Sequence, residues 1–208
     1  MLGIASPTVV EFRQYTLVPG QRDVLIDIFT RETIEPQEAL GMSILGAFRD
    51  LDNPDRFVWI RGFADMAARG EALQAFYGGP VWKAIREAAN ATMIDSDNVL
   101  LLHEEQPGSG LTPGELAKGF VVAGIHYFEV IVDPGDIETQ LKNAGIDVLA
   151  TYVSETSANN FPRLPVREND RVFVWFAAFP DQASWEKNVA NLDQEILGRE
   201  VLRLQPVS

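Results

Sequence analysis

In the first half of the chain, stretches in which apolar and polar residues alternate are followed by stretches whose apolar positions recur every three to four residues. Alternation is typical of a half-buried strand, and the longer period is typical of an amphipathic helix. Together they predict six elements in the order β-α-β-β-α-β, at residues 8–17, 21–41, 42–49, 56–64, 65–91 and 99–102. This is the order of the ferredoxin-like split βαβ unit.

Both predicted helices contain residues that interrupt a helix. Pro36 lacks the amide proton that an interior helical position donates, so a break or kink is expected there. Residues 76–82 read Phe-Tyr-Gly-Gly-Pro-Val-Trp, which should break the second helix before it resumes at Lys83. Asp65 is predicted to cap the start of this helix, because its carboxylate can accept hydrogen bonds from the free amides of the first turn.

The second half of the chain repeats this plan. Residues 57–65 and 173–181 are identical at five of nine positions, including the triplet Phe-Val-Trp. The distance from Pro19 to the first triplet is 38 positions, and that from Pro134 to the second is 39. The repeat predicts a strand at 121–132, a helix from 136, strands at 147–156 and from 171, a helix from 181, and a strand at 201–204.

A stretch dense in Gly, Pro and small polar residues separates the two halves and is typical of a linker. We therefore predict a first ferredoxin-like unit at residues 1–104, a linker at 105–119 and a second, degenerate unit at 120–208 that lacks the Gly-Gly-Pro segment. Each unit covers one face of its sheet with helices, so the other face must be buried, most simply against the sister sheet. The predicted fold class is α+β, with two ferredoxin-like units in tandem forming a pseudo-symmetric α/β barrel.

The motifs of the first unit also resemble a known family. Residues 10–15 (Val-Glu-Phe-Arg-Gln-Tyr), 56–65 and 76–82 are similar to those of the NIPSNAP family, within the dimeric α/β-barrel superfamily. The resemblance covers most of residues 8–104 and is weak over 120–206. It implies a ferredoxin-like fold that pairs into a barrel, as a homodimer or a fused tandem, and it implies no established catalytic activity. The wider superfamily includes cofactor-independent monooxygenases, isomerases and heme-handling enzymes.

Composition narrows the range of partners. The chain has 17 Lys and Arg against 30 Asp and Glu, and its formal net charge of -13 disfavours nucleic acid and anionic membranes. It has no cysteine, and no phosphate loop, nucleophile elbow or His-rich set stands out, so neither a metal nor another cofactor is predicted. With no basic segment ahead of an apolar one at the N-terminus, a cytoplasmic protein is expected. A small-molecule ligand and a homo-oligomer of the fused tandem remain as expected partners.

Arg61 is the most informative candidate residue. The strand that contains it has an aliphatic face and an aromatic face, with Val58, Ile60, Gly62 and Ala64 on the first and Phe57, Trp59, Arg61 and Phe63 on the second. We expect the aliphatic face to pack on helices and the aromatic face to line the barrel interior. A buried guanidinium stays charged and needs a carboxylate or an anionic ligand, and Glu11 is the nearest carboxylate by pattern. The counterpart of Arg61 is Ala177, so Arg61 either binds a ligand or pairs internally and fixes the fold.

Proton-transfer candidates lie on the first strand of each unit. Glu11, Arg13 and Tyr15 alternate on one face of residues 8–17, where they either line the same cavity or form a solvated face. His126 falls opposite Glu11 in the repeat alignment and is the imidazole expected inside the barrel, where it either transfers protons or is only hydrogen-bonded in place. The candidate catalytic residues are His126, Tyr15 and Glu11.

Two aromatic residues flank the Gly-Gly-Pro break. Tyr77 and Trp82 either cover the mouth of a pocket or only accompany a helix kink. Arg86 lies four residues after Trp82 on the same helical face and would complete a site for a ligand acid. The candidate ligand-binding residues are Trp59, Arg61, Phe63, Tyr77, Trp82, Arg86 and Arg13.

Three functions fit these observations. The first is a barrel that binds a small, largely apolar ligand with an acidic or carbonyl group in the first unit, while the second unit mainly closes the barrel. The second is a cofactor-independent monooxygenase or isomerase in which His126, Tyr15 or Glu11 moves a proton. The third is a protein-interaction module. The first two place the function in a cavity, and the third places it on the outer surface.

Overall fold

A computed structural model describes residues 7–129, 134–190 and 192–207. Its strands are β1 (Val9–Leu17), β2 (Ser43–Asp50), β3 (Arg56–Phe63), β4 (Met93–Asp95), β5 (Val99–Glu104), β6 (Phe120–Phe128), β7 (Val148–Ser154), β8 (Arg171–Phe179) and β9 (Glu200–Pro206). Its helices are α1 (Arg22–Ile28), the π-helix η1 (Phe29–Thr33), α2 (Ile34–Glu38), α3 (Met66–Gly78), α4 (Pro80–Ala91), α5 (Gly135–Asn143), α6 (Gln182–Val189) and α7 (Gln194–Leu197). Residues 1–6, on which the expectation about a leader rests, and 130–132 of the predicted strand lie outside the described residues.

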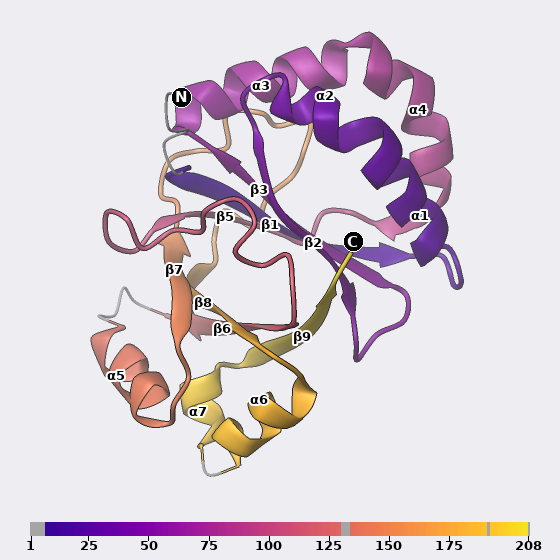
Figure 1. The fold of residues 1–208 in the computed structure, drawn as a ribbon. Helices are drawn as coiled ribbons and strands as arrows, with labels where there is room; N and C mark the ends of the chain where they lie inside the picture. The colour runs from indigo at the N-terminus through magenta and orange to yellow at the C-terminus, as the bar shows by residue number, and fades with distance from the viewer. Residues whose placement is uncertain (1–6, 130–133, 191, 208) are drawn as a thin grey trace.

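Within the described residues, eight strands form a closed antiparallel barrel. They follow the order β3-β2-β9-β6-β8-β7-β5-β1, and β1 pairs with β3 to close the ring, while β4 pairs with β1 beside it. Each unit contributes four consecutive strands, joined at β2 with β9 and at β5 with β7. Figure 1 shows α1 to α4 on the side of the first unit and α5 to α7 on the side of the second. The predicted α+β barrel of two ferredoxin-like units is confirmed.

The barrel interior is filled with aliphatic and aromatic side chains from both units. Val58 and Ile60 of β3 lie in this core, together with Phe12 of β1. Trp59 and Phe63 instead pack beneath the helices. The expectation that the aromatic face lines the interior is therefore wrong. An eight-stranded barrel is only wide enough for interlocking side chains, whereas the broad surface between sheet and helices accommodates large rings and arginines.

The segment predicted as a linker contributes to this core. Leu111 and Leu116 are both fully buried against the barrel interior. The backbone N–H of Leu111 donates to the Tyr152 hydroxyl at 2.7 Å, which ties this segment to β7. The Gly and Pro residues of this segment therefore form turns, and these turns place Leu111 and Leu116 against the barrel interior.

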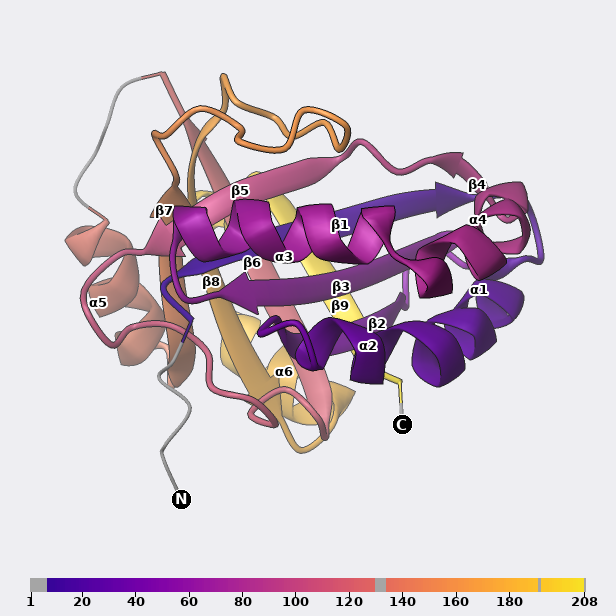
Figure 2. The same cartoon turned by 90° about the horizontal axis from the view of Figure 1, so that it is seen from above.

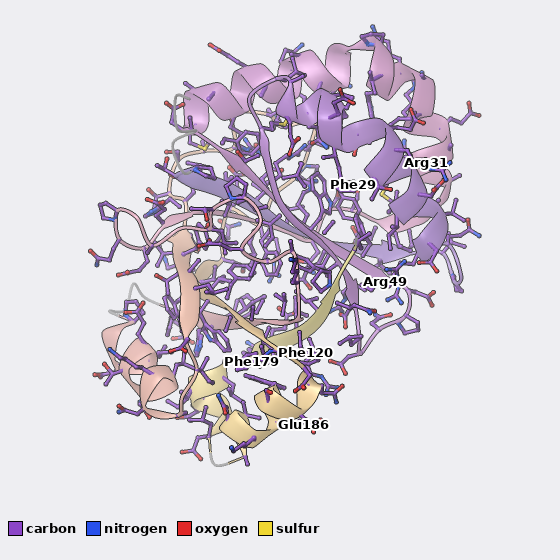
Figure 3. The ribbon with its side chains drawn as sticks, in the orientation of Figure 1. Phe29, Arg31, Arg49, Phe120, Phe179 and Glu186 are labelled. Atoms are coloured by element: carbon purple, nitrogen blue, oxygen red, sulfur yellow. The ribbon has the colours of Figure 1, made fainter. Side chains whose placement is uncertain are left out.

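The first helical segment does not break at Pro36. It widens into η1, which ends at Thr33, and continues as α2, which contains Pro36 and ends at Glu38. A π-helical turn shifts the hydrogen-bond register, and such turns are frequent at functional sites. In consequence Phe29, Thr33 and Gln37 are all buried beneath the helix. Figure 3 shows Phe29 on the inner side of this segment and Arg31 on its outer side.

The Gly-Gly-Pro segment separates α3 from α4 by the single residue Gly79. Pro80 occupies the first turn of α4, where its missing N–H costs nothing, and Asp65 caps the start of α3 through the N–H of Ala68. A Cβ on Gly79 would lie 2.8 Å from the carbonyl oxygen of Ala75, whereas one on Gly78 would meet nothing closer than 4.0 Å. The chain thus turns closely over the last carbonyl groups of α3 at residue 79, and this turn requires glycine at Gly79 but not at Gly78. Across the described ranges, none of the helices has the length and apolar character that a membrane span requires.

The two adjacent glycines are expected to respond in opposite directions to alanine. Gly79→Ala should lower the free energy of unfolding by about 1–3 kcal/mol, because the added methyl overlaps a helix carbonyl. Gly78→Ala should be neutral or stabilise by up to about 1 kcal/mol, because alanine favours the helical conformation. Urea unfolding of both variants measures the difference, and equal stabilities would contradict this account of the break.

Candidate functional site

A buried charge cluster lies between the first-unit sheet and α3, centred on the carboxylate of Glu11. Oε2 of Glu11 accepts hydrogen bonds from Nε and Nη2 of Arg61 at 3.0 and 2.6 Å, so the predicted pair is present. Nη1 of Arg13 donates to the same oxygen at 2.5 Å, and Nε of Arg69 donates to Oε1 at 2.8 Å. All four side chains are at most 1% exposed. One carboxylate therefore holds three guanidinium groups.

The positions of these residues follow from strand register and helix period. Glu11 of β1 lies directly opposite Arg61 of β3, and the two-residue pleat places Arg13 on the same outer face. Arg69 lies four residues after the cap Asp65, so the first turn of α3 directs it back over the sheet. The cluster thus fixes α3 on β1 and β3.

The electrostatics keep Glu11 ionised. Burial by itself would raise the pKa of the carboxyl group, but the attraction of Arg61, Arg13 and Arg69 outweighs it and holds the pKa far below its ordinary range. Burial likewise raises the pKa of the Tyr15 phenol, with Arg13 opposing this shift. Glu11 is therefore an anion and Tyr15 a neutral phenol near neutral pH.

Three polar side chains link the cluster to an adjoining cavity. Nη1 of Arg61 donates to Oε1 of Gln37 at 2.8 Å and to the Tyr77 hydroxyl at 3.4 Å. Nε of Arg13 donates to the Tyr15 hydroxyl at 2.9 Å. Because both phenol oxygens accept hydrogen bonds from arginine, their protons remain available to donate elsewhere.

The cavity lies between the outer face of the first-unit sheet and helices α1 to α4, and it measures about 50 Å³. That volume holds a few water molecules in the present side-chain arrangement. Its walls are mainly apolar, and the lining residues are Tyr15, Leu25, Ile28, Phe29, Thr33, Gln37, Trp59, Phe76, Tyr77, Trp82, Ala89 and Met93. Trp59, Tyr77 and Trp82 of the sequence-predicted set therefore line one cavity, outside the barrel.

The predicted binding residues that do not line this cavity occupy three environments. Arg61 and Arg13 lie in the charge cluster behind it, with the Arg61 guanidinium 4.9 Å from the Trp59 ring centroid. Phe63 packs against α3, and its ring centroid lies 5.6 Å from the Arg61 guanidinium. Arg86 is exposed on α4, so the expectation that it completes the site is not supported by its position.

His126 does not lie inside the barrel. It occupies the outer face of β6, where its ring stacks near Phe128 and Phe173, and burial lowers its pKa to about 4. The strand registers place His126 at the position of Tyr15, whereas the position of Glu11 is taken by Val122. The expectation that His126 falls opposite Glu11 is therefore wrong by four residues along the strand. His126 is separate from the first-unit site.

The second unit keeps the fold but not the charges. By strand register and helix cap, Glu11, Arg13, Tyr15, Arg61 and Arg69 correspond to Val122, Gly124, His126, Ala177 and Trp185. A Cβ on Gly124 would lie 2.2 Å from the Trp175 ring, so the missing side chain makes room for that ring. Trp175 and Trp185 then fill the equivalent space with an apolar core. In the second unit an apolar core therefore occupies the space that the charge cluster fills in the first.

Several site residues were not singled out in the sequence. Arg69 follows the cap by one helical turn, a spacing that would have indicated its direction. Asn159 and Asn160 lie in the connection between β7 and β8, and their side-chain oxygens accept hydrogen bonds from Nη1 of Arg69 at 3.0 and 2.6 Å. No local pattern predicts this contact, since the partners are about 90 positions apart. Figure 2 shows this orange connection running beside β5 and α3. Within the described residues, no group of three or more His, Asp or Glu side chains is placed to hold a metal ion.

The closed ring of two four-stranded units defines the fold class, an α+β barrel of two ferredoxin-like units in one chain. Residues 10–103, which make up the first unit, match the model of the NIPSNAP family. A NIPSNAP-like domain protein from Burkholderia xenovorans is 22% identical, with 52% of this chain and 94% of that chain covered and a TM-score of 0.46.

Two solved structures match nearly the whole chain. A candidate monooxygenase from Lactobacillus acidophilus is 13% identical, with 96% of this chain and 94% of that chain covered and a TM-score of 0.56. Another from Fusobacterium nucleatum is 12% identical, with 98% and 94% covered and a TM-score of 0.54. Identities this low show a shared fold alone. No curated protein gives a significant match to the sequence.

Removing the central anion should destabilise the protein strongly. Glu11→Gln leaves three buried guanidinium groups without their counterion, and the free energy of unfolding at pH 7 should fall by about 3–5 kcal/mol. Because the folded-state pKa of Glu11 is lowered, its contribution is complete above the ordinary value of about 4.3 and is lost as the pH falls below it. Below that value, the difference in the free energy of unfolding between wild type and Glu11→Gln should narrow by up to about 1.4 kcal/mol per pH unit, as measured by urea unfolding. The exposed Glu87→Gln serves as control, and equal effects of both substitutions would contradict the role of Glu11.

His126 should make stability depend on pH in a different window. Its folded-state pKa of about 4 lies below the ordinary value of about 6.5, so the unfolded chain binds the proton more readily between these values. The free energy of unfolding should therefore fall as the pH is lowered from 6.5 to 4. The slope should stay below about 1.4 kcal/mol per pH unit, because the unfolded and folded states differ by less than one bound proton. His126→Phe should remove this slope in urea titrations, and an unchanged slope would refute the assignment.

Proposed function

We propose that the protein binds a small, largely apolar molecule with an acidic or carbonyl group in the cavity between the first-unit sheet and its helices. The observation that carries this proposal is the charge excess beside the cavity. Arg13, Arg61 and Arg69 share one carboxylate, so three positive charges less one negative charge leave a formal excess of two. Such an excess inside a chain of net charge -13 favours a bound group with negative or partly negative charge.

Two phenol groups connect the arginines of the cluster to the cavity in which the ligand would bind. Tyr15 and Tyr77 line the cavity, and each accepts a hydrogen bond from an arginine of the cluster. A guanidinium that donates to a phenol oxygen polarises its O–H bond and strengthens the hydrogen bond that the phenol donates in turn. Two such donors suit a carboxylate or a carbonyl oxygen, while Leu25, Phe29 and Trp59 suit an apolar body.

Comparison of the two halves supports binding over a purely structural role. Trp175 and Trp185 fill the equivalent space in the second unit, where the sheet and helices pack through an apolar core. Maintaining three buried arginines costs desolvation energy that an apolar core avoids. The cluster is therefore better explained by what it binds than by the needs of the fold.

The geometry supports proton transfer by Glu11, Tyr15 or His126 less well than it supports ligand binding. Glu11 is held as an anion by three guanidinium groups and is a poor proton acceptor. Tyr15 has a raised pKa and stays protonated, and His126 lies in the other unit. The monooxygenase or isomerase hypothesis would have to use other groups or the substrate itself as base, and binding is the function that these residues support best.

Filling the cavity should remove the ligand. Ala89 lines the cavity, so Ala89→Leu occupies much of a space of about 50 Å³ without changing any charge. We expect native mass spectrometry of the purified wild-type protein to show a bound small molecule that is absent from Ala89→Leu.

Ala91→Leu is the matched control, because Ala91 lies on the exposed side of the same helix and receives the same side chain. It should retain the ligand at the wild-type level. Circular dichroism verifies that both variants are folded. Retention of the same mass by Ala89→Leu, or a wild-type protein that takes up no member of a panel of apolar carboxylic acids and ketones, would contradict the proposal.

A further inference from the structure

A second pocket adjoins the first behind a partition of two aromatic rings. It measures about 210 Å³ and is lined by Tyr77, Trp82, Asn90, Phe161, Arg163 and Leu164. Tyr77 and Trp82 also line the inner cavity, and their ring centroids are 5.0 Å apart at an interplanar angle of 73°. These two rings therefore separate an inner chamber from an outer pocket.

Half of the outer pocket comes from the second unit. Phe161, Arg163 and Leu164 belong to the connection between β7 and β8, whereas Tyr77 and Trp82 belong to the first unit. Phe161 stacks on Tyr77 at 5.8 Å and 29°, and it is only 5% exposed.

The same connection is anchored close by. Asn160 donates from Nδ2 to the carbonyl oxygen of Met66 and accepts from Arg69. Asn159 accepts from Arg69 as well, and its own Nδ2 donates to the carbonyl oxygen of Leu164. The pocket walls are therefore held in place before any ligand enters.

The chemistry of the pocket is that of a site for an aromatic anion. The guanidinium of Arg163 lies 5.8 Å from the Phe161 ring centroid, and the side chain is exposed. Among the ion pairs of the described residues, none includes Arg163. Asn90 adds an exposed amide, and Trp82 adds a half-buried indole. A cation, an amide donor and apolar rings thus border one small concave space.

We propose that this pocket is a second ligand site, which binds a one-ring aromatic carboxylate with its ring against Trp82 and Phe161 and its carboxylate at Arg163 and Asn90. Arginine is suited to this role because its planar fork matches a carboxylate and stacks on aromatic faces. The volume is below the roughly 300–1,000 Å³ of sites for drug-sized molecules, which favours a single ring. This site does not require the inner cavity to be occupied, so it extends beyond the function proposed above.

Phenylacetate and phenylacetamide provide a test, because they have nearly the same shape and differ in charge. We expect phenylacetate to shift the Trp82 indole and Asn90 side-chain signals in ¹H–¹⁵N NMR spectra at millimolar concentration, and phenylacetamide to bind several-fold more weakly. Arg163→Gln should weaken phenylacetate binding about three- to tenfold, as expected for a charge-assisted hydrogen bond at a partly exposed site. Arg163→Lys should retain part of the affinity, because it keeps the charge but not the planar fork.

Two variants separate this site from alternatives. Arg86→Gln removes an exposed arginine from α4 that lines neither pocket, and it should leave phenylacetate affinity unchanged. Ala89→Leu fills the inner cavity and should also leave it unchanged, so failure of the inner-site proposal and failure of this one are distinguishable. The proposal is overturned if phenylacetate causes no shift at Asn90, which lines the outer pocket and not the inner cavity, if Arg86→Gln weakens binding as much as Arg163→Gln, or if Ala89→Leu abolishes binding while Arg163→Gln does not.

Discussion

The ion cluster around Glu11 connects the parts of the first unit that must be placed correctly for a cavity to exist. Its carboxylate joins β1 to β3 through Arg61 and joins both to α3 through Arg69. Arg69 in turn contacts Asn159 and Asn160 of the second unit. Since an unpaired buried charge costs several kcal/mol, each contact strongly constrains its element. The same interaction that orients the helices therefore also supplies the positive charge beside the cavity.

Duplication explains the barrel, and divergence explains why the two halves differ. Each four-stranded sheet has one face beneath its own helices and one face that only the sister sheet can cover, so closing the ring buries both. The resulting interior is packed with apolar side chains and has no role for charge. Both pockets described above lie outside the ring: the outer one borders the connection between β7 and β8, and the inner one lies between the first-unit sheet and its helices. The first unit has a polar cluster there, and the second has an aromatic core.

The connection between β7 and β8 makes the two units interdependent at the site. Phe161 stacks on Tyr77 of the first unit, and Asn160 bonds to the start of α3. The second unit was expected mainly to close the barrel, but it also forms part of the wall next to the aromatic partition. A protein in which one half holds the charges and the other half covers them has a structural reason to keep both halves in one chain.

The sequence by itself determined the repeat, the order of the elements, the helix break at Gly79 and the pairing of Glu11 with Arg61. These features depend on local periodicity, on turn residues and on the match between two copies. The sequence could not determine which face of β3 turns inward, because a two-residue period separates two faces without stating which one is enclosed. Barrel closure decided this, since a narrow ring excludes Trp59 and Arg61 and the helices cover them. Tertiary structure also decided the contacts of Arg69 with Asn159 and Asn160, because residues about 90 positions apart meet only once both units have folded.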